Sequence, residues 1–199
     1  MVRHYTTAML KKVVEKKGYR WLDDGRPCHL NLIGIRRNTD IPNSFDDVFA
    51  VCHLEGAVWK SSQWQCTTDP GLYWLRNPQN VKGCAILKPG QYFDCWQVGK
   101  HQGQYDALVQ TGPVTVIRDA DRDAVLDYGA KLEDTGLFGI NIHRAGAVVE
   151  SVQVDRWSAG CQVLASPSSF AKLMRLAFES RRLGRRAFSY TLLEEKDFV

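Results

Sequence analysis

The segment Phe138–Ser166 reads FGINIHRAGAVVESVQVDRWSAGCQVLAS, and it combines strand-like patterning with two reactive side chains. Ile140 and Ile142 alternate with polar residues, which is the period of a half-buried strand and places the next side chain, His143, on the face opposite the isoleucines. Cys161 follows later in the same segment, ahead of another apolar run. We therefore expect two β segments, joined by a return loop, to bring an imidazole and a thiol close together.

The residues between the histidine and the cysteine support this prediction. Residues 147–154, AVVESVQV, are strand-like, and the small residues of Ser158-Ala159-Gly160 allow a tight turn directly before the thiol. A free thiol has a pKa of about 8.5, and a neighbouring imidazole can take its proton and make it a nucleophile toward an amide carbonyl. The alternative is structural, because a single cysteine is often a buried small hydrophobe and a single histidine is often a surface residue.

The spacing also resembles a known active-site signature. His143, the intervening segment 144–157 and then Ser158, Ala159, Gly160 and Cys161 resemble the motif of the YkuD-type L,D-transpeptidases. The GINIH run is similar to that family's apolar strand into the histidine, so the similarity covers residues 138–164. The resemblance implies a mainly β, sandwich-like catalytic domain with a few packed helices. It also implies a cysteine enzyme that attacks the L,D amide of peptidoglycan stem peptides, between the third residue and the following D-alanine.

The resemblance assigns roles to individual residues. Cys161 would attack the carbonyl, His143 would act as base and later as acid, and the backbone carbonyl of Arg144 would orient the imidazole. The amides of Gly160 and Cys161 would line the oxyanion site. Further candidates for substrate binding are Asn141, Trp157, Ser158 and Ala159.

Two positions depart from the family pattern. Ala159 stands where the family usually has a histidine, and Gln162 stands where an arginine commonly follows the cysteine. Arg144 or Arg156 is a candidate for the replacement cation, and an ordinary exposed arginine is the alternative for each. Trp157 is expected either to line the groove that binds the acyl donor or to be a core aromatic.

The missing export signal bears on the kind of enzyme. The opening stretch, MVRHYTTAMLKKVVEKKG, is charged and amphipathic, without the apolar segment of a secretory signal, so the sequence predicts synthesis in the cytoplasm. Together with the resemblance, this favours an enzyme that reaches the cell wall as a phage or delivered protein, and it favours hydrolysis over the formation of 3-3 cross-links. The loss of two motif residues leaves open a non-catalytic wall-binding or virion structural module.

The remainder of the chain predicts one mainly β domain over residues 1–199. A helix is expected after a cap at Thr6 or Thr7, ending at Gly18, and a second begins after Ser166. The expected core stripe of the second helix is Phe170, Leu173, Met174, Ala177 and Phe178. Short β-branched or aromatic runs between turn residues predict many strands. Residues 56–100 are expected as aromatic-rich loops that form either a wall over the cleft or a second small core.

An acidic segment partly matches a calcium loop. Its carboxylates fall at the first, third, fifth and ninth loop positions, but Ala124 and Ala130 stand where glycine and a bidentate glutamate belong. An acidic turn is therefore favoured over a calcium site, and no cofactor is predicted. The weak candidate ligands are Asp119, Asp121, Asp123 and Asp127.

Charge and cysteine usage limit the other function classes. The net charge is +4, and five arginines lie between Arg175 and Arg186, which predicts a solvated helix face or a contact with an anionic polymer. No nucleic-acid reader motif is recognised, and no apolar run is long enough to span a bilayer, so neither nucleic-acid binding nor membrane insertion is expected. The six cysteines form no CxxC pair, and reduced thiols without a zinc site are expected. The expected partners are peptidoglycan stem peptides, with the oligomeric state left open.

Overall fold

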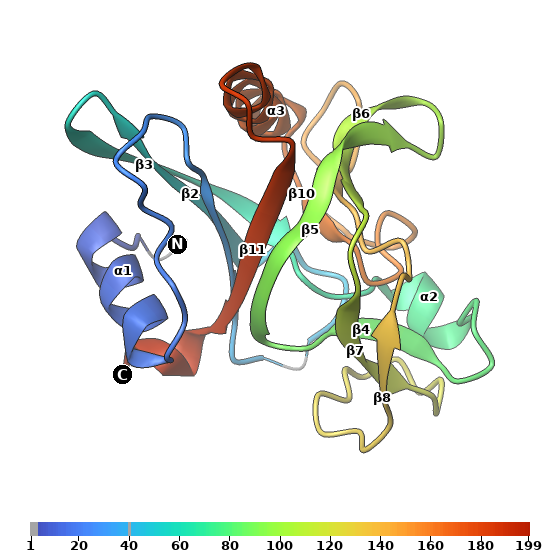
Figure 1. Ribbon diagram of the computed structural model, residues 1–199. Coiled ribbons are helices and arrows are strands. Elements are labelled where there is room, and N and C mark those ends of the chain that lie inside the picture. Colours follow the sequence, from blue (N-terminus) through green and yellow to red (C-terminus); the bar gives the residue numbers. More distant parts are fainter. Residues whose placement is uncertain (1–3, 40) are drawn as a thin grey trace.

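The chain folds into two β-sheets with helices packed around them (Figure 1). The computed structural model describes residues 4–39 and 41–199. The strands are β1 (Asn31–Arg36), β2 (Asp47–Glu55), β3 (Val58–Thr67), β4 (Cys84–Leu87), β5 (Gly90–His101), β6 (Tyr105–Gln110), β7 (Val114–Asp119), β8 (Glu133–Gly136), β9 (Ile142–Arg144), β10 (Gln162–Leu164) and β11 (Ala187–Glu194). The helices are α1 (Thr7–Lys16), α2 (Leu72–Arg76), α3 (Pro167–Arg182) and the 3-10 helix η1 (Glu195–Phe198).

The larger sheet closes on itself as an eight-stranded barrel in the order β1-β11-β5-β6-β9-β10-β3-β2. The pairs β1–β11 and β9–β10 are parallel, and the other neighbours are antiparallel. The contact between β6 and β9 is the narrowest, with the single register pair Leu108 and Ile142. The prediction of a mainly β fold with a few packed helices is confirmed.

The smaller sheet has the order β4-β7-β8 and packs against the core of the barrel. Ala85 and Leu87 on β4 belong to the main core, whereas Cys84 and Ile86 face a separate apolar cluster with Leu75 of α2. This alternation is the period of two expected for a strand that is covered on both faces. The sheet therefore joins the barrel to the segment around α2, at the lower right of Figure 1.

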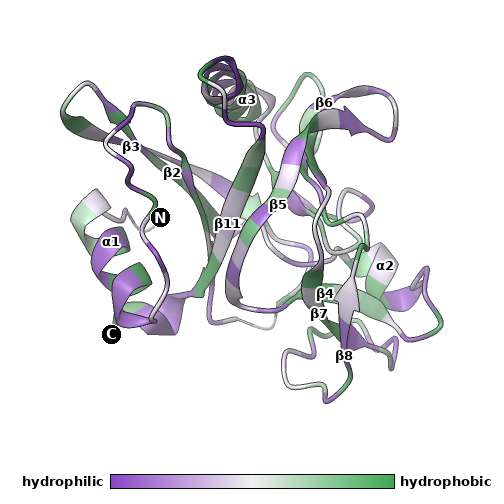
Figure 2. Cartoon of the chain, viewed as in Figure 1, coloured by the Kyte–Doolittle hydropathy of each residue, from purple (hydrophilic) through white to green (hydrophobic). Residues whose placement is uncertain are grey.

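Helix α1 begins where the sequence predicted. The Thr6 side chain accepts a hydrogen bond from the Met9 N–H at 3.2 Å, which satisfies one of the free amides of the first turn. Leu10, Val13 and Val14 are buried against β1 and β2, while the rest of the helix is largely hydrophilic (Figure 2). A single apolar stripe is enough to dock a surface helix of this length.

Helix α3 also begins as predicted, with Ser166 as the cap and Pro167 in the first turn. Four of the five expected core residues are buried, but Phe178 is 41% exposed and the prediction for it is wrong. Ser180 is buried instead, because its hydroxyl donates to the Cys28 carbonyl at 2.8 Å. The helix is rotated so that Phe178 lies at the edge of the stripe.

Two expectations about the connecting segments are wrong. Residues 147–154 form no strand apart from one bridge between Ser44 and Gln153, and Val148, Val149 and Val152 are exposed. The reason is that β9 and β10 pair directly, so the residues between them only cross from one strand to the next. Residues 56–100 are mainly β3, α2, β4 and β5 rather than loops, and Trp96 is fully buried in the main core.

Candidate active site

The pairing of β9 and β10 places His143 and Cys161 on one face. In the parallel register Gln162 lies beside Ile142 and Val163 lies beside His143, and the Gln162 N–H donates to the Asn141 carbonyl at 2.9 Å. Side chains alternate along each strand, so Cys161 shares the face of His143 on the neighbouring strand. The two residues are offset by two positions along the paired segments, so both side chains lie on the same face of the β9–β10 pair.

Gln110 and Trp96 hold the entry to β9. The Gln110 Oε1 atom accepts hydrogen bonds from the Phe138 N–H at 3.0 Å and from the Ile140 N–H at 2.8 Å. The indole N–H of Trp96 donates to the Ile140 carbonyl at 2.7 Å. These long-range bonds fix the backbone just before the histidine.

His143 is buried, with 3% of its surface exposed, and its hydrogen bonds define its tautomer. Its Nδ1 lies 2.8 Å from the Arg144 carbonyl, which can only accept, so Nδ1 carries the proton and Nε2 keeps its lone pair. The Tyr105 hydroxyl donates to the same carbonyl at 3.2 Å. Burial, followed by the neighbouring His101 and Arg144, lowers the pKa of His143 to about 3, so the imidazole is neutral at physiological pH.

The Cys161 thiol is partly exposed and bonds to backbone groups. Its Sγ lies 3.3 Å from the Gly139 carbonyl, and the backbone N–H of Asn141 interacts with it. Burial raises the pKa of Cys161 to about 11, and the Asn141 N–H opposes this rise. The resting pair is therefore a neutral thiol and a neutral imidazole rather than a thiolate and an imidazolium.

The turn before the thiol is closed by Ser158. The Ser158 hydroxyl donates to the Cys161 carbonyl at 2.8 Å and accepts from the Gly160 N–H at 3.1 Å. Gly160 has a φ of 121°, and a Cβ at this position would overlap the Ala85 carbonyl. The expected oxyanion role of the Gly160 amide does not fit this state, because that N–H is already bonded. In the part of the chain that the structure describes, the Cys161 N–H has no such partner.

The structure adds two residues that the sequence patterns did not indicate. His101, at the end of β5, stacks on His143 with ring centroids 4.0 Å apart and an angle of 21° between the planes. Tyr105, at the start of β6, lies 3.3 Å from His143 Nδ1 through its hydroxyl. Both come from the β5–β6 hairpin, well upstream in the chain, and no local spacing connects that hairpin with the motif.

The other candidate residues lie around this cluster. The Asn141 side chain contacts His101, and the Arg144 guanidinium lies 4.1 Å above the Tyr105 ring. Arg156 instead lies 3.9 Å above the Tyr73 ring, and the neighbouring Trp157 is 44% exposed. Trp157 is therefore a surface residue and not a core aromatic, whereas Arg144 is the arginine next to the histidine pair.

Gln162 faces the opposite side and belongs to a buried polar network. Its amide Nε2 lies 3.3 Å from the Gly160 carbonyl and 3.4 Å from the Thr68 carbonyl, and its Oε1 accepts from the Tyr190 hydroxyl at 2.8 Å. The Arg36 guanidinium donates to the same Thr68 carbonyl at 3.0 Å. The buried Arg36 guanidinium thus lies close to the turn before Cys161. This cation is supplied by β1 rather than by residue 162.

The Arg36 cation is balanced by two buried acids. Its Nε lies 2.9 Å from Asp69 Oδ1, and Asp47 accepts the Thr68 N–H and hydroxyl at 2.7 Å and 2.8 Å. Burial, followed by the nearby Asp69, raises the pKa of Asp47 to about 7. The network joins β1, the start of β2 and the end of β3 at one end of the barrel.

The acidic segment after β7 brings three of its four candidate ligands together. Carboxylate atoms of Asp119, Asp121 and Asp127 lie within 4.8 Å of one another, and among the described residues this is the only such group of His, Cys, Asp or Glu. Asp123 is not part of the group, and its side chain accepts the Val125 N–H at 2.7 Å. Burial raises the pKa of Asp119 to about 6. These three carboxylates are the residues that could hold a cation.

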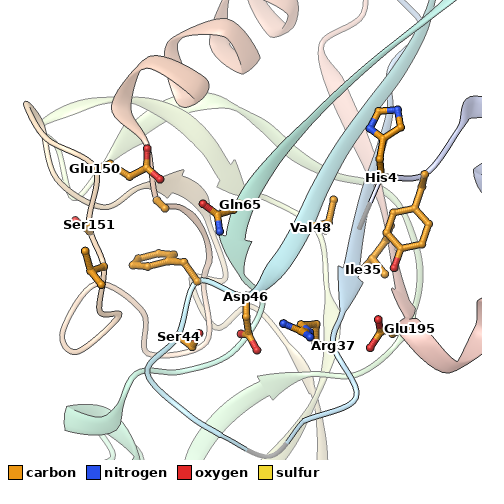
Figure 3. A pocket seen from close by; sticks show the side chains of 14 residues that line it. His4, Ile35, Arg37, Ser44, Asp46, Val48, Gln65, Glu150, Ser151 and Glu195 are labelled. Carbon is orange, nitrogen blue, oxygen red and sulfur yellow. The ribbon is translucent and has the colours of Figure 1, made fainter. Parts of the chain in front are cut away.

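Figure 3 shows a groove of the molecule; its volume is about 960 Å³, and neither His101 nor His143 lines it. Gln65 and Val48 lie along its middle, Glu150 is at one side and His4 is at the other. Its lining does not include Cys161 either. Phe45 and Ala165 belong both to the groove lining and to the apolar cluster against which Cys161 packs.

All six cysteines are free thiols, and Cys28 and Cys161 are the two that are partly exposed. Within residues 4–39 and 41–199, no helix has the length and apolar character needed to cross a membrane.

In comparisons with known proteins, no family model, no curated protein and no solved structure matches this chain.

Proposed function

We propose that this chain is a cysteine enzyme that cleaves the L,D amide of peptidoglycan stem peptides through an acyl-enzyme. The observation that carries the proposal is the register of β9 and β10, which presents His143 and Cys161 on the same face of adjacent strands. The Nδ1–H bond to the Arg144 carbonyl adds to it, because a base needs the free lone pair at Nε2. The resemblance of the His143–Cys161 spacing to the L,D-transpeptidase motif supplies the substrate class.

The neutral resting pair defines the order of events. The Cys161 Sγ would attack the amide carbonyl carbon while its proton passes to His143 Nε2, forming a C–S bond and a tetrahedral oxyanion. The imidazolium would then protonate the leaving amine as the C–N bond breaks, which leaves a thioester. Water, deprotonated by His143, would release the acid and restore the thiol. This is general base catalysis at the moment of attack, not the use of a preformed thiolate.

The oxyanion in this proposal is stabilised by the Cys161 N–H. That group has no hydrogen-bond partner among the described residues, whereas the Gly160 N–H donates to Ser158. One well-placed donor contributes about 2.7 to 4 kcal/mol to transition-state stabilisation in a well-studied hydrolase. The finer fold assignment, a sandwich-like L,D-transpeptidase domain, is part of the same proposal, and the three-stranded sheet that packs against the core of the barrel supports it.

Hydrolysis is the proposed outcome, by a phage-borne or delivered protein acting on the cell wall. Transfer of the acyl group to an acceptor amine would instead give a 3-3 cross-link by the same first step. The two outcomes differ only in the nucleophile that attacks the thioester, so the mass of the product distinguishes them.

A non-catalytic wall-binding module is the second candidate, and a specific observation favours it. The thiol bonds to the Gly139 carbonyl and its pKa is raised to about 11, which is the environment of an unreactive cysteine. Such a module would bind muropeptides without turning them over.

Mass spectrometry of defined tetrapeptide and cross-linked muropeptides tests these alternatives. The wild-type protein is expected to release D-alanine, and Cys161→Ala is expected to bind but not to cleave. Cys28→Ala is the matched control, because Cys28 is the other partly exposed thiol and lies outside the cluster. Turnover that persists in Cys161→Ala would refute the proposal, and binding without turnover by the wild type would establish the second candidate.

A further inference from the structure

The stacked pair of His101 and His143 is more than a packing contact. Both side chains are buried, with 9% and 3% of their surfaces exposed, and their rings lie nearly parallel at a centroid distance of 4.0 Å. Neither ring pairs with a carboxylate in the described part of the chain, so two charges here would be uncompensated. The contact therefore links the protonation state of one ring to that of the other.

Asn141 fixes the tautomer of His101. The Gln110 N–H donates to Asn141 Oδ1 at 2.9 Å, so the amide nitrogen Nδ2 is the atom that faces the ring. It lies 3.1 Å from His101 Nδ1 and donates to it. Nδ1 of His101 is thus the acceptor, and the proton of the neutral ring is on Nε2.

Tyr105 and Arg144 complete the surroundings of the two rings. The Tyr105 ring lies 5.5 Å from the His101 ring, and its hydroxyl shares the Arg144 carbonyl with His143 Nδ1. The Arg144 guanidinium lies over Tyr105, and Cys161 is close enough to affect the Tyr105 hydroxyl. Burial and then Arg144 lower the pKa of His101, so both imidazoles are neutral. Among the described residues, Arg144, Tyr105 and the other imidazole of the pair are the titratable or charged groups that contact or electrostatically influence these two rings.

We propose that His101 is a positioning residue: its ring, held by Asn141, keeps the His143 ring in one plane and in the neutral form, while the Arg144 carbonyl keeps the proton on Nδ1. The catalytic part of this inference rests on the proposed function, because it assigns His143 as the base. The inference also assigns the second imidazole of the site to β5 of this chain, in a structure where the motif position 159 is alanine. No direct contact of His101 with substrate is required.

The test replaces His101 by glutamine and by phenylalanine. His101→Gln keeps an acceptor for Asn141 but removes the stacked ring, whereas His101→Phe keeps a stacked ring but removes the acceptor. Long-range ¹H–¹⁵N spectra report the tautomer and titration of His143 in the protein without substrate. The wild type is expected to show a single Nδ1–H form that resists protonation down to about pH 4.

In His101→Gln, His143 is expected to titrate at higher pH, while the Arg144 carbonyl keeps the proton of the neutral ring on Nδ1. In His101→Phe, the His143 ring is expected to remain neutral. Its ¹H–¹⁵N signals are expected to broaden or double, because Asn141 no longer fixes the ring that stacks on it. In muropeptide turnover, kcat is expected to fall by up to about 100-fold with KM unchanged and with a shifted acid limb of the pH profile. His53→Gln, which replaces a buried histidine of β2 outside the cluster, controls for the general loss of an imidazole.

The possible results separate the two proposals. If the His143 titration and ring signals are the same in the wild type and in both His101 variants, the positioning role is refuted. If they change as expected but no protein turns over muropeptides, the positioning role stands and the proposed enzymatic function fails. If His101→Gln does not fold, His101→Phe decides through the His143 ring signals: broadened or doubled signals support the positioning role, and sharp signals identical to those of the wild type refute it.

Discussion

At the residue scale, the candidate site is a pair of neutral groups held by backbone bonds. The thiol of Cys161 bonds to the segment before β9, and the imidazole of His143 bonds to the Arg144 carbonyl. The spacing of the sequence was enough to select these two residues. It could not select His101 and Tyr105, because they are positioned by hydrogen bonds between β5, β6 and β9 that leave no local pattern in the chain.

The reactivity of Cys161 should rise with pH well beyond neutrality. Its pKa is raised to about 11 by burial, so the thiolate fraction increases about tenfold per pH unit between pH 7 and 10. We expect the rate of iodoacetamide labelling, followed by peptide mass spectrometry, to increase in the same way. A preformed ion pair with His143 would instead give a fast rate that is independent of pH near neutrality, and this result would contradict the neutral pair.

At the element scale, the turn into β10 is the least tolerant segment of the site. Ser158 closes it with two hydrogen bonds, and Gly160 occupies a left-handed conformation against the Ala85 carbonyl of β4. Caps and apolar stripes located α1 and α3 from sequence. These patterns did not predict that residues 147–154 form a crossover. The valines of this segment are typical of a strand, but no sheet edge is free to pair with them.

Gly160→Ala is expected to lower the free energy of unfolding by more than ~1 kcal/mol, since the new Cβ meets backbone at a positive φ. Urea unfolding of both proteins measures this difference. Gly129→Ala is the control, because a Cβ there meets nothing within 4 Å. Equal stability of the two variants would show that the turn relaxes without cost.

At the scale of the whole molecule, the barrel is closed by its most distant segments. Strand β11 pairs in parallel with β1, so the end of the chain lies beside its first strand. The sequence predicted the strand content, yet this closure depends on pairing between the first and the last strand of the chain and is not visible in local periodicity. Arg36, at the end of β1, anchors this region to the end of β3 through Thr68.

Removing the Arg36 cation should destabilise the entire fold. Arg36→Met leaves Asp47 and Asp69 buried without their counter-charge, and breaking a buried ion pair in this way costs about 3–5 kcal/mol. The double variant Arg36→Met with Asp69→Asn is expected to recover part of the loss. Thermal unfolding of the three proteins checks this, and an unchanged midpoint in Arg36→Met would exclude the network as a determinant of stability.

The direct parallel pairing of β9 and β10 has a consequence for how this protein can diversify. Since the imidazole and the thiol are set by strand register, the exposed crossover residues Val148, Val149 and Val152 can vary without moving either side chain. Insertions beside these valines are expected to reshape the surface next to the candidate site, whereas the buried Ala145 and Val154 fix the two ends of the crossover. Sequence change in the crossover should therefore alter this surface more than the positions of His143 and Cys161.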